Sequence, residues 1–550
     1  MSSTPVAVPS GHRWAGLGVL VLAVTLVAVD ATVLSLAIPS ITETLRPSGT
    51  ELLWIGDVYS FVLAGLLVSM GALSDRLGRK RVLLAGSVAF GAASLLAAYA
   101  PSPGWLVLAR ALLGVAGATI MPSTLSLIRT LFPDPKERAT AIGVWGAGAA
   151  AGAALGPLVG GVLLEHFWWG SVFLLNLPVM VLLLVFGAWL LPESRDPRPG
   201  RWDVLSVLLS MAGVIGVVYG VKEFAVHGPE RWTTPLVFAL GAAALAVFVR
   251  RQLRLETPLL DVRLFRDARF TAAVVSSLIC LIGLSGVIFF MSQYLQLVRG
   301  YSPLHAGFAE MPAFVGSVAG GLLTARLVRR AGARRVLTVS LFVMGLGIGV
   351  LGFVRVDSAY LLLGSSFLAL GTAEGVVYTL SSDLVLGAAP ATKAGAASAV
   401  SETAYELGAA LGIALVGSIV TALYAGSLSV PAGVDPALAD QAAQSLGGAR
   451  ESAAALPAGP AGELLASAND AFVHGVTVAA WVSAALLLAA AALAHRLLRH
   501  RPAPDVATGT SAVAATGTPA GTPGETPAGT PAGVRAEAHA ETHAKEHAHR

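Results

Sequence analysis

Long apolar stretches separated by short polar segments run through most of this chain. The hydrocarbon core of a bilayer requires roughly 20 apolar residues in each spanning helix, and a window of that length finds fourteen such stretches. Their approximate limits are 15–39, 53–74, 82–100, 104–129, 139–163, 170–191, 204–221, 233–250, 270–297, 304–325, 335–354, 359–386, 397–424 and 472–495. The pattern predicts an all-α integral membrane protein with 14 transmembrane helices.

Three polar segments are long enough to stand apart from these helices. Residues 1–14 form a short cytoplasmic start, and 426–471 is an Ala-rich external loop with room for one or two short amphipathic helices. The tail 498–550 repeats Thr-Pro steps among Gly and Ala and ends in several histidines. Such a composition cannot bury a core, so we expect a disordered cytoplasmic tail.

Composition and charge agree with a membrane location. Hydrophobic residues make up 55% of the chain and charged residues 12%, against about 25% charged residues in soluble globular proteins. Most Lys and Arg residues fall in loops that are cytoplasmic when both termini are cytoplasmic, as the positive-inside rule requires. We therefore expect a multi-pass protein of the cytoplasmic membrane with both ends inside, and its positive charge is no sign of nucleic-acid binding.

Several kinds of chemistry find no support in the sequence. Cys280 is the single cysteine, so a disulfide or a cysteine-based metal site within one chain is ruled out. We found neither a phosphate-binding loop nor a dinucleotide fingerprint, which argues against ATP as the energy source. We expect no enzyme activity, no cofactor and no metal.

A loop sequence occurs twice. Residues 71–81 contain Gly, Asp and Arg at fixed spacing after the second span, and residues 321–335 repeat this more weakly after the tenth. Parallel repeats of this kind build transporters whose substrate site lies between two halves. The repeat predicts six-helix bundles at 15–200 and 256–497, with two inserted helices at 201–255.

The fifth span has one helix face composed mainly of glycine, which has no side chain. Small residues let helix backbones approach closely, and an internal proline bends the helix. The residues concerned are Gly143, Gly152, Gly156, Pro157, Gly160 and Gly161. Their spacing resembles the antiporter motif of the major facilitator drug exporters, and the resemblance implies the major facilitator fold with Gly152, Gly156, Pro157 and Gly160 as a hinge.

Other stretches extend the resemblance over roughly 15–425 and the last span. The loop residues Asp75, Arg76, Gly78 and Arg79 match the family's gating signature, whereas Ala325 replaces the acid in the second copy. The stretches 168–178 and 294–307 resemble patterns of the sixth helix and of the ninth and tenth helices. The chain thus resembles the fourteen-helix drug:proton antiporters, in particular the exporters of quaternary-ammonium compounds and methyl viologen.

Charges inside the spans of the first half are candidates for proton coupling, because charges in lipid are costly. Asp30 lies in mid-span without a basic residue on its own helix, so it suits a proton carrier or an anchor for a cation. Arg110 is deep in the fourth span and requires an acid or carbonyl groups as partners. Asp57 lies nearer the outer face, where Trp54 and Tyr59 would complete an exit site for cations, unless Asp57 is simply hydrated.

Acids of the second half are candidates for substrate binding. Glu374 lies in mid-span with Tyr378 one turn later, and Glu406 adjoins Tyr405. Glu402 shares a helix face with Glu406, but it lies closer to the helix end, where solvent is an alternative environment. We prefer Glu374 and Glu406 as the acids that face the substrate.

The sequence therefore predicts a proton-coupled exporter of lipophilic, cationic drugs across the cytoplasmic membrane. Its partners would be the small-molecule substrate, protons and the lipid bilayer, and we expect a monomer. A dedicated exporter of one endogenous natural product, with the same fold and coupling, is the alternative. A membrane receptor or enzyme that moves nothing is a third hypothesis, which a flux assay would decide.

Overall fold

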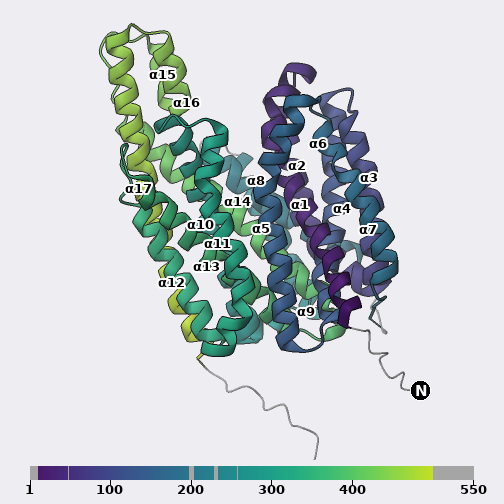
Figure 1. Ribbon diagram of the computed structural model, residues 1–550. Helices are drawn as coiled ribbons and strands as arrows, with labels where there is room; N and C mark the ends of the chain where they lie inside the picture. Colours follow the sequence, from purple (N-terminus) through teal and green to yellow (C-terminus); the bar gives the residue numbers. More distant parts are fainter. Residues whose placement is uncertain (1–9, 48, 197–202, 228–232, 257, 500–550) are drawn as a thin grey trace, which may run out of the picture. The chain divides into compact units, whose positions relative to one another are not determined.

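Among the residues that it describes, the computed structural model contains fourteen helices long and apolar enough to cross a bilayer, which confirms the predicted number. It describes residues 10–47, 49–196, 203–227, 233–256 and 258–499, and every regular element in these ranges is helical. The predicted tail and the first residues of the chain lie outside this part. Figure 1 shows the helices running side by side with their labels.

The first half comprises α1 to α7. Their bounds are Ser10–Leu45 for α1, Gly49–Leu77 for α2, Arg79–Ala98 for α3, Pro103–Leu131 for α4, Pro135–His166 for α5, Ser171–Leu174 for α6 and Asn176–Leu190 for α7. The sixth predicted span is thus broken into the short α6 and the longer α7.

The second half comprises α10 to α17. Its main helices are α10 (Ala268–Gln293), α11 (Pro303–Ala331), α12 (Ala333–Leu351), α13 (Tyr360–Ala388), α14 (Ala394–Ser427) and α17 (Ala458–Leu497). A π-helical turn, Tyr294–Val298, follows α10, and a 3-10 turn, Ala391–Lys393, precedes α14.

The two halves repeat the same packing. In the first, α1 packs on α5, α2 on α4, and α3 on α4 and α7; in the second, α10 packs on α14, α11 on α13, and α12 on α13 and α17. Between the halves, α5 contacts α11 and α2 contacts α14, so these contacts also correspond. This arrangement confirms the predicted fold of two six-helix bundles with two further helices.

Glycine turns connect the corresponding helix pairs. Gly78 joins α2 to α3 with φ 112°, and Gly332 joins α11 to α12 with φ 79°. Residues with a Cβ rarely adopt this region. The glycines of the repeated loop therefore have the same conformational role in each half.

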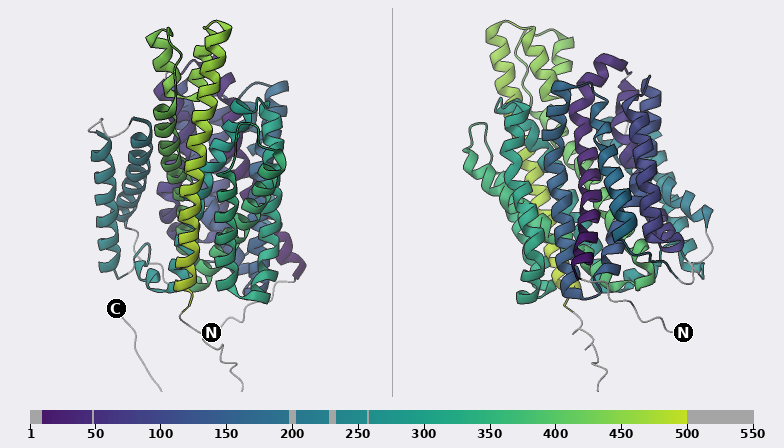
Figure 2. Two further views of the ribbon diagram at one scale, coloured as in Figure 1. Left: turned by 90° about the vertical axis from the view of Figure 1, so that its left-hand side faces the viewer. Right: turned by 45° about the vertical axis from the view of Figure 1, so that its right-hand side comes forward.

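The inserted pair consists of α8 (Val204–His227) and α9 (Thr233–Arg254). It lies beside the bundle in Figure 2, and α8 packs against both α2 and α14, one from each half. Asp203 precedes α8 and accepts hydrogen bonds from Arg251 of α9 at 2.8 and 3.1 Å. These bonds lower the pKa of Asp203 to about 2, so the ion pair persists at neutral pH.

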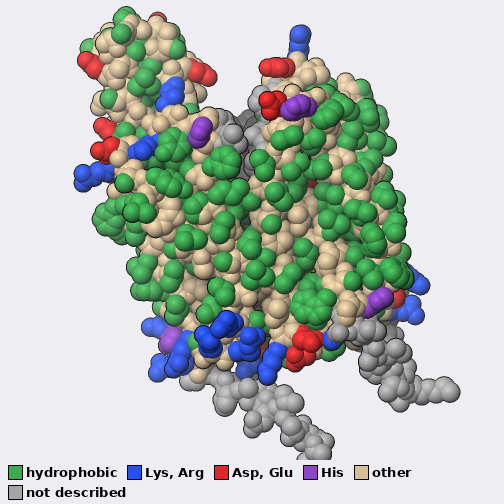
Figure 3. Space-filling view, in the orientation of Figure 1, with side chains coloured by type: hydrophobic (Ala, Val, Ile, Leu, Met, Phe, Trp, Pro, Cys, Tyr) green, Lys and Arg blue, Asp and Glu red, His purple; other side chains and the backbone are tan. Residues whose placement is uncertain are grey.

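The two ends of the bundle differ in charge and in added structure. Lys and Arg side chains gather at the lower end in Figure 3, below a broad hydrophobic zone; we call this the basic end, where α2 meets α3. The opposite end, the far end, carries α15 (Pro436–Gln444) and α16 (Leu446–Ala454) within the predicted external loop. The Tyr424 hydroxyl donates to the Ala442 carbonyl at 2.9 Å and fixes α15 to α14.

The glycine face of α5 packs mainly against α1, within the first half. A Cβ at Gly152 would meet the Thr25 carbonyl and lie 3.0 Å from the Ala28 Cβ, and one at Gly156 would meet Thr32. Farther toward the basic end, a Cβ at Gly143 would meet the backbone of Gly321 in α11. The motif thus serves close packing inside the half and, at Gly143, between the halves.

Replacing Gly152 with Val should destabilise the fold, because the new side chain has no room against α1. Overpacking of this kind costs roughly 1–3 kcal/mol. Gly161→Val is the matched control on the same helix, because nothing lies within 4 Å of its added Cβ. The measurement is the thermal unfolding midpoint of each purified variant in detergent. Equal midpoints for the two variants would contradict the packing role of Gly152.

Candidate functional site

A cavity of about 340 Å³ lies between the two halves. Its wall is formed by α1, α2, α4 and α5 from the first half and by α10, α11, α13 and α14 from the second. Four acidic side chains line it: Glu310, Glu374, Glu402 and Glu406. Lys, Arg and His are absent from the described residues of this wall. The cavity therefore favours positive charge.

Two tyrosines hold two of these acids in a reciprocal arrangement. The Tyr378 hydroxyl of α13 donates to Glu402 of α14 at 3.1 Å, and the Tyr405 hydroxyl of α14 donates to Glu374 of α13 at 2.7 Å. The tyrosine ring centroids are 4.5 Å apart. Ser317 donates to the second oxygen of Glu374 at 2.6 Å. Neutral hydroxyl groups thus position both carboxylates without neutralising them.

The other two acids are less satisfied. Glu406 is half-buried, and the structure shows no hydrogen bond to it from a described residue. One oxygen of Glu310 is buried and likewise lacks a partner in the described part of the chain. Ser317, which bonds to Glu374, lies seven positions after Glu310 on α11, a rise of about 10 Å along the helix. Glu310 and Glu374 therefore lie at different levels of the cavity.

Aromatic side chains border the acids from the first half as well. Trp145 of α5 is fully buried and stacks on Tyr378 with ring centroids 5.7 Å apart and an interplanar angle of 16°. The Trp145 ring thereby fixes the tyrosine that bonds to Glu402. Both halves contribute to the same cluster of rings and carboxylates.

A second polar site lies behind the cavity wall in the first half. Asp30 of α1 forms an ion pair with Arg110 of α4 at 3.2 Å and accepts a hydrogen bond from the Asn176 amide at 2.8 Å. Asn176 also donates to Ser94 at 3.0 Å. Neither Asp30 nor Arg110 lines the cavity, and both are buried, at 1% and 2% exposure. This Asp30–Arg110 site connects α1, α3, α4 and α7.

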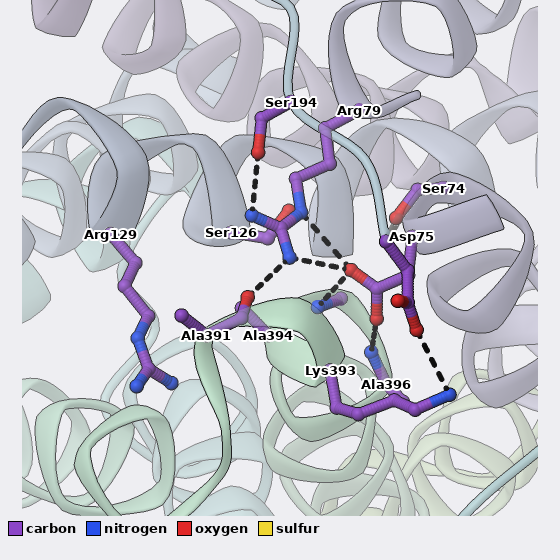
Figure 4. Close-up of polar contacts among 12 residues, drawn as sticks. Ser74, Asp75, Arg79, Ser126, Arg129, Ser194, Ala391, Lys393, Ala394 and Ala396 are labelled. Atoms are coloured by element: carbon purple, nitrogen blue, oxygen red, sulfur yellow. Dashed lines mark hydrogen bonds and ion pairs between the residues drawn. The ribbon is translucent and has the colours of Figure 1, made fainter. Parts of the chain in front are cut away.

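The loop after α2 joins the two halves at the basic end, as Figure 4 shows. The Asp75 carboxylate accepts hydrogen bonds from the backbone N–H groups of Gly395 and Ala396, at 2.9 and 3.0 Å. Because these groups open α14, the acid lies at the positive end of the helix dipole. Arg79 pairs with Asp75 at 2.8 Å and donates to the Ala391 carbonyl at 2.7 Å. Asp75 and Arg79 thus both connect the first half to the second half.

A second contact between the halves uses other residues. Arg138 of α5 pairs with Asp383 of α13 at 2.9 Å, and Arg129 of α4 donates to the Leu386 carbonyl. Ala325, which replaces the acid in the second loop copy, is buried and has no charge to contribute. The ion pair of α5 and α13 is thus a charged contact between the halves that does not involve the second loop copy.

The remaining candidates from the sequence lie in varied places. Trp54 stacks on Tyr219 of α8, with centroids 6.4 Å apart, and does not line the cavity. The side chains of Asp57 and Pro157 lie outside the described part. Arg76 is half-buried at the basic end, and Gly160 is buried on α5.

Some residues of the site gave no functional signal in the sequence. Asn176 stood in a recognised pattern without a role, and Trp145 lay within the glycine motif as an apparent packing residue. Ser317 is an uncharged residue within a span, so its sequence context alone gives it no role. Glu310 and Asp383 lie near helix ends, where solvent is an alternative environment for an acid. Each of these residues becomes part of the site through a contact or a neighbour on a helix distant in the sequence.

Two pseudo-equivalent helix bundles enclosing a central cavity with acidic side chains in its wall are the architecture of a membrane transporter. The sequence model of the Major Facilitator Superfamily matches residues 20–413, and the chain belongs to this family.

Several relatives are similar over nearly their whole length. The multidrug efflux pump LfrA of Mycolicibacterium smegmatis is 48% identical over 90% of this chain and 99% of its own. The methyl viologen resistance protein SmvA of Salmonella typhimurium is 37% identical, covering 87% and 97%. The puromycin resistance protein pur8 of Streptomyces alboniger is 34% identical, covering 92% and 95%. Among solved structures, the human organic anion transporter MFSD10 shares the fold, with a TM-score of 0.59, 16% identity and coverage of 87% and 100%.

Reversing the charge of Arg138 should open the basic end. The variant Arg138→Asp places a second acid beside Asp383 in a largely buried position, and the two negative charges repel each other. We expect amide hydrogen exchange in 386–396 to accelerate at least tenfold, and Asp383→Arg in the same chain to restore it. Hydrogen–deuterium exchange read by mass spectrometry measures this. Arg251→Asp, which breaks an ion pair inside the inserted helices, is the matched control. Failure of the double reversal to restore slow exchange would contradict a direct role of the pair.

Proposed function

We propose that this protein exports lipophilic cations across the cytoplasmic membrane in exchange for protons. The observation that carries the proposal is the cavity between the halves, in which four acids and several aromatic rings meet and the described wall holds no basic side chain. Acids attract a cation in a low-dielectric cavity, and aromatic faces bind it through their π electrons.

The names of the relatives support the same cargo class. LfrA is named a multidrug efflux pump and SmvA a methyl viologen resistance protein. Their similarity extends over both halves, so it includes the helices that form the cavity. We propose that the basic end is cytoplasmic, as are both termini, and that the protein acts as a monomer without a cofactor.

The proton gradient would act through the Asp30–Arg110 site. Asp30 lies in the middle of its span, is paired with Arg110 inside the bundle and is separated from the cavity. A proton on Asp30 leaves Arg110 without its counter-charge. We propose that this change in charge favours one orientation of the two halves over the other.

The contacts at the basic end indicate which orientation is present. Here α2 meets α14 and α5 meets α11, with Asp75 and Arg138 joining the halves. At the far end the surface between the halves is hollowed (Figure 3). We propose that the structure represents the state that releases cargo to the outside, and that entry requires the Asp75 and Arg138 contacts to open.

Dedicated export of one natural product is the second candidate. It is favoured by the relative named as a puromycin resistance protein. A resistance panel of cationic, neutral and acidic compounds in an efflux-deficient host separates the two. Protection against many unrelated cations supports the first proposal, and protection against one compound alone supports the second.

Asp30→Asn should abolish proton-driven export, because the amide keeps the volume of Asp30 but cannot bind and release a proton. The measurement is ethidium accumulation in everted vesicles energised by a pH gradient, with a protonophore as the zero. Asp203→Asn, which alters an acid of the inserted helices, should transport normally. Wild-type accumulation by Asp30→Asn would exclude Asp30 as the proton site.

Glu406→Gln should raise the apparent KM for ethidium about tenfold, because the cation loses a carboxylate that no described donor occupies. Glu374→Gln should have a smaller effect on KM, since Tyr405 and Ser317 already bond to that side chain. Neutral cargo should be spared in both variants. If Glu374→Gln instead weakens ethidium transport more than Glu406→Gln, the assignment of the cation anchor is reversed.

A further inference from the structure

Tyr59 of α2 adjoins both polar sites. It lines the cavity, whereas Asp30, Arg110 and Asn176 do not. On its other side, the guanidinium carbon of Arg110 lies 4.6 Å from the centroid of the Tyr59 ring. Tyr59 itself is only 3% exposed. One aromatic ring therefore stands between the cavity and the ion pair.

The packing of α4 explains how Arg110 reaches this ring. A Cβ at Gly114 would lie 2.7 Å from the Tyr59 carbonyl oxygen, and one at Gly117 would lie 3.2 Å from the Tyr59 hydroxyl. The position of Gly114 requires glycine for α4 to approach α2 so closely, and at Gly117 a Cβ would be in tight contact with side chains of α2. The Tyr59 hydroxyl is buried and has no hydrogen-bond partner in the described part of the chain. The described interaction of Tyr59 with Arg110 is therefore made by its ring and not by its hydroxyl group.

We propose that Tyr59 makes cargo and proton compete, because a cation in the cavity binds to the same aromatic ring that the Arg110 guanidinium contacts from the other side. The inference rests on the proposed function and adds to it the residue through which the two sites interact. Tyr59 acts as a positioning residue toward Asp30, because it does not contact the proton.

The physical basis is the charge that a cation experiences across the ring. With Asp30 ionised, Arg110 and Asp30 form a pair with little net charge. When Asp30 takes up a proton from water, Arg110 keeps its charge and loses its carboxylate. Within the described part of the chain, Arg110 still has the Ile55 carbonyl, at 3.4 Å, and the Tyr59 ring. A full positive charge then lies across one ring from the cavity and repels a cation held there.

Other ionisable groups border the same cavity. Glu402 and Glu406 of α14, Glu374 of α13 and Glu310 of α11 lie in its wall. A pH profile would mix their titration with that of Asp30. The test therefore uses Asp30→Asn at a single pH of about 8 as a stand-in for the protonated acid.

The experiment is a double-mutant cycle on the purified full-length protein, with ethidium and tetraphenylphosphonium as monovalent probes. Asp30→Asn should weaken binding of each probe about tenfold in the wild-type background, within the usual range of coupling between sites. In the Tyr59→Leu background the same change should have less than a twofold effect. Tyr59→Phe, which keeps the ring, should retain the tenfold effect.

Controls make each outcome decisive. Tyr99→Leu removes a tyrosine that is 63% exposed and should keep the tenfold effect. Each variant must give a single size-exclusion peak; Tyr59→Met, also ringless, replaces Tyr59→Leu if the latter does not fold. A tenfold effect that persists without the ring overturns the inference, as does an absent effect in the wild-type background. Failure of the wild-type protein to bind either cation would instead refute the proposed function, and the inference with it.

Discussion

A charge buried in an apolar helix bundle must be balanced inside the bundle, because neither lipid nor the packed interior solvates it. The guanidinium of Arg110 meets this requirement through Asp30, and the carboxylate of Asp75 through Arg79 and the first backbone N–H groups of α14. Each partner comes from another helix. The positions of the helices and the charges of these groups therefore cannot change independently.

The location of each pair decides what a rocking motion of the halves would do to it. Asp30 and Arg110 belong to α1 and α4, so their pair stays within the first half. The contacts of Asp75 with α14 and of Arg138 with Asp383 cross between the halves. In the proposed cycle, opening the basic end breaks the crossing contacts and leaves the Asp30–Arg110 pair intact. Only a proton changes the charge of that pair, which is why it suits the coupling role.

The sequence was sufficient for the fold, because length and hydropathy alone determine how many helices can cross a bilayer, and the repeated loop indicates two halves. It also drew attention to Asp30, Arg110 and three of the four cavity glutamates, since an intramembrane charge is conspicuous in any single span; Glu310, near a helix end, was not among them. It could not supply partners across helices. The reciprocal hydrogen bonds of Tyr378 and Tyr405 depend on how α13 and α14 face each other. The hydrogen bond from Asn176 to Asp30 forms where the sixth span is interrupted between α6 and α7.

The same limit applies to the glycines of α5. Their spacing predicts a small helix face, and the resemblance to exporters suggested a hinge. In the structure Gly152 and Gly156 face α1 inside one half, and Gly143 faces α11 of the other. Spacing along one helix does not reveal which neighbour occupies its small face. Gly143 is thus the member of the motif whose contact a motion between the halves would alter.

The choice of partners distinguishes the proposed proton site from the proposed cation site. Arginine has a permanent charge, so placed beside the cavity it would repel the cargo that the acids attract. In the structure Arg110 is behind the wall with Asp30, and the acids that line the cavity have tyrosine and serine partners instead. A neutral hydroxyl orients a carboxylate and leaves its negative charge for the ligand. In the proposed cycle, Glu374 and Glu402 therefore remain fixed in place and still attract a cation, while the proton exchanges at Asp30, behind the Tyr59 ring.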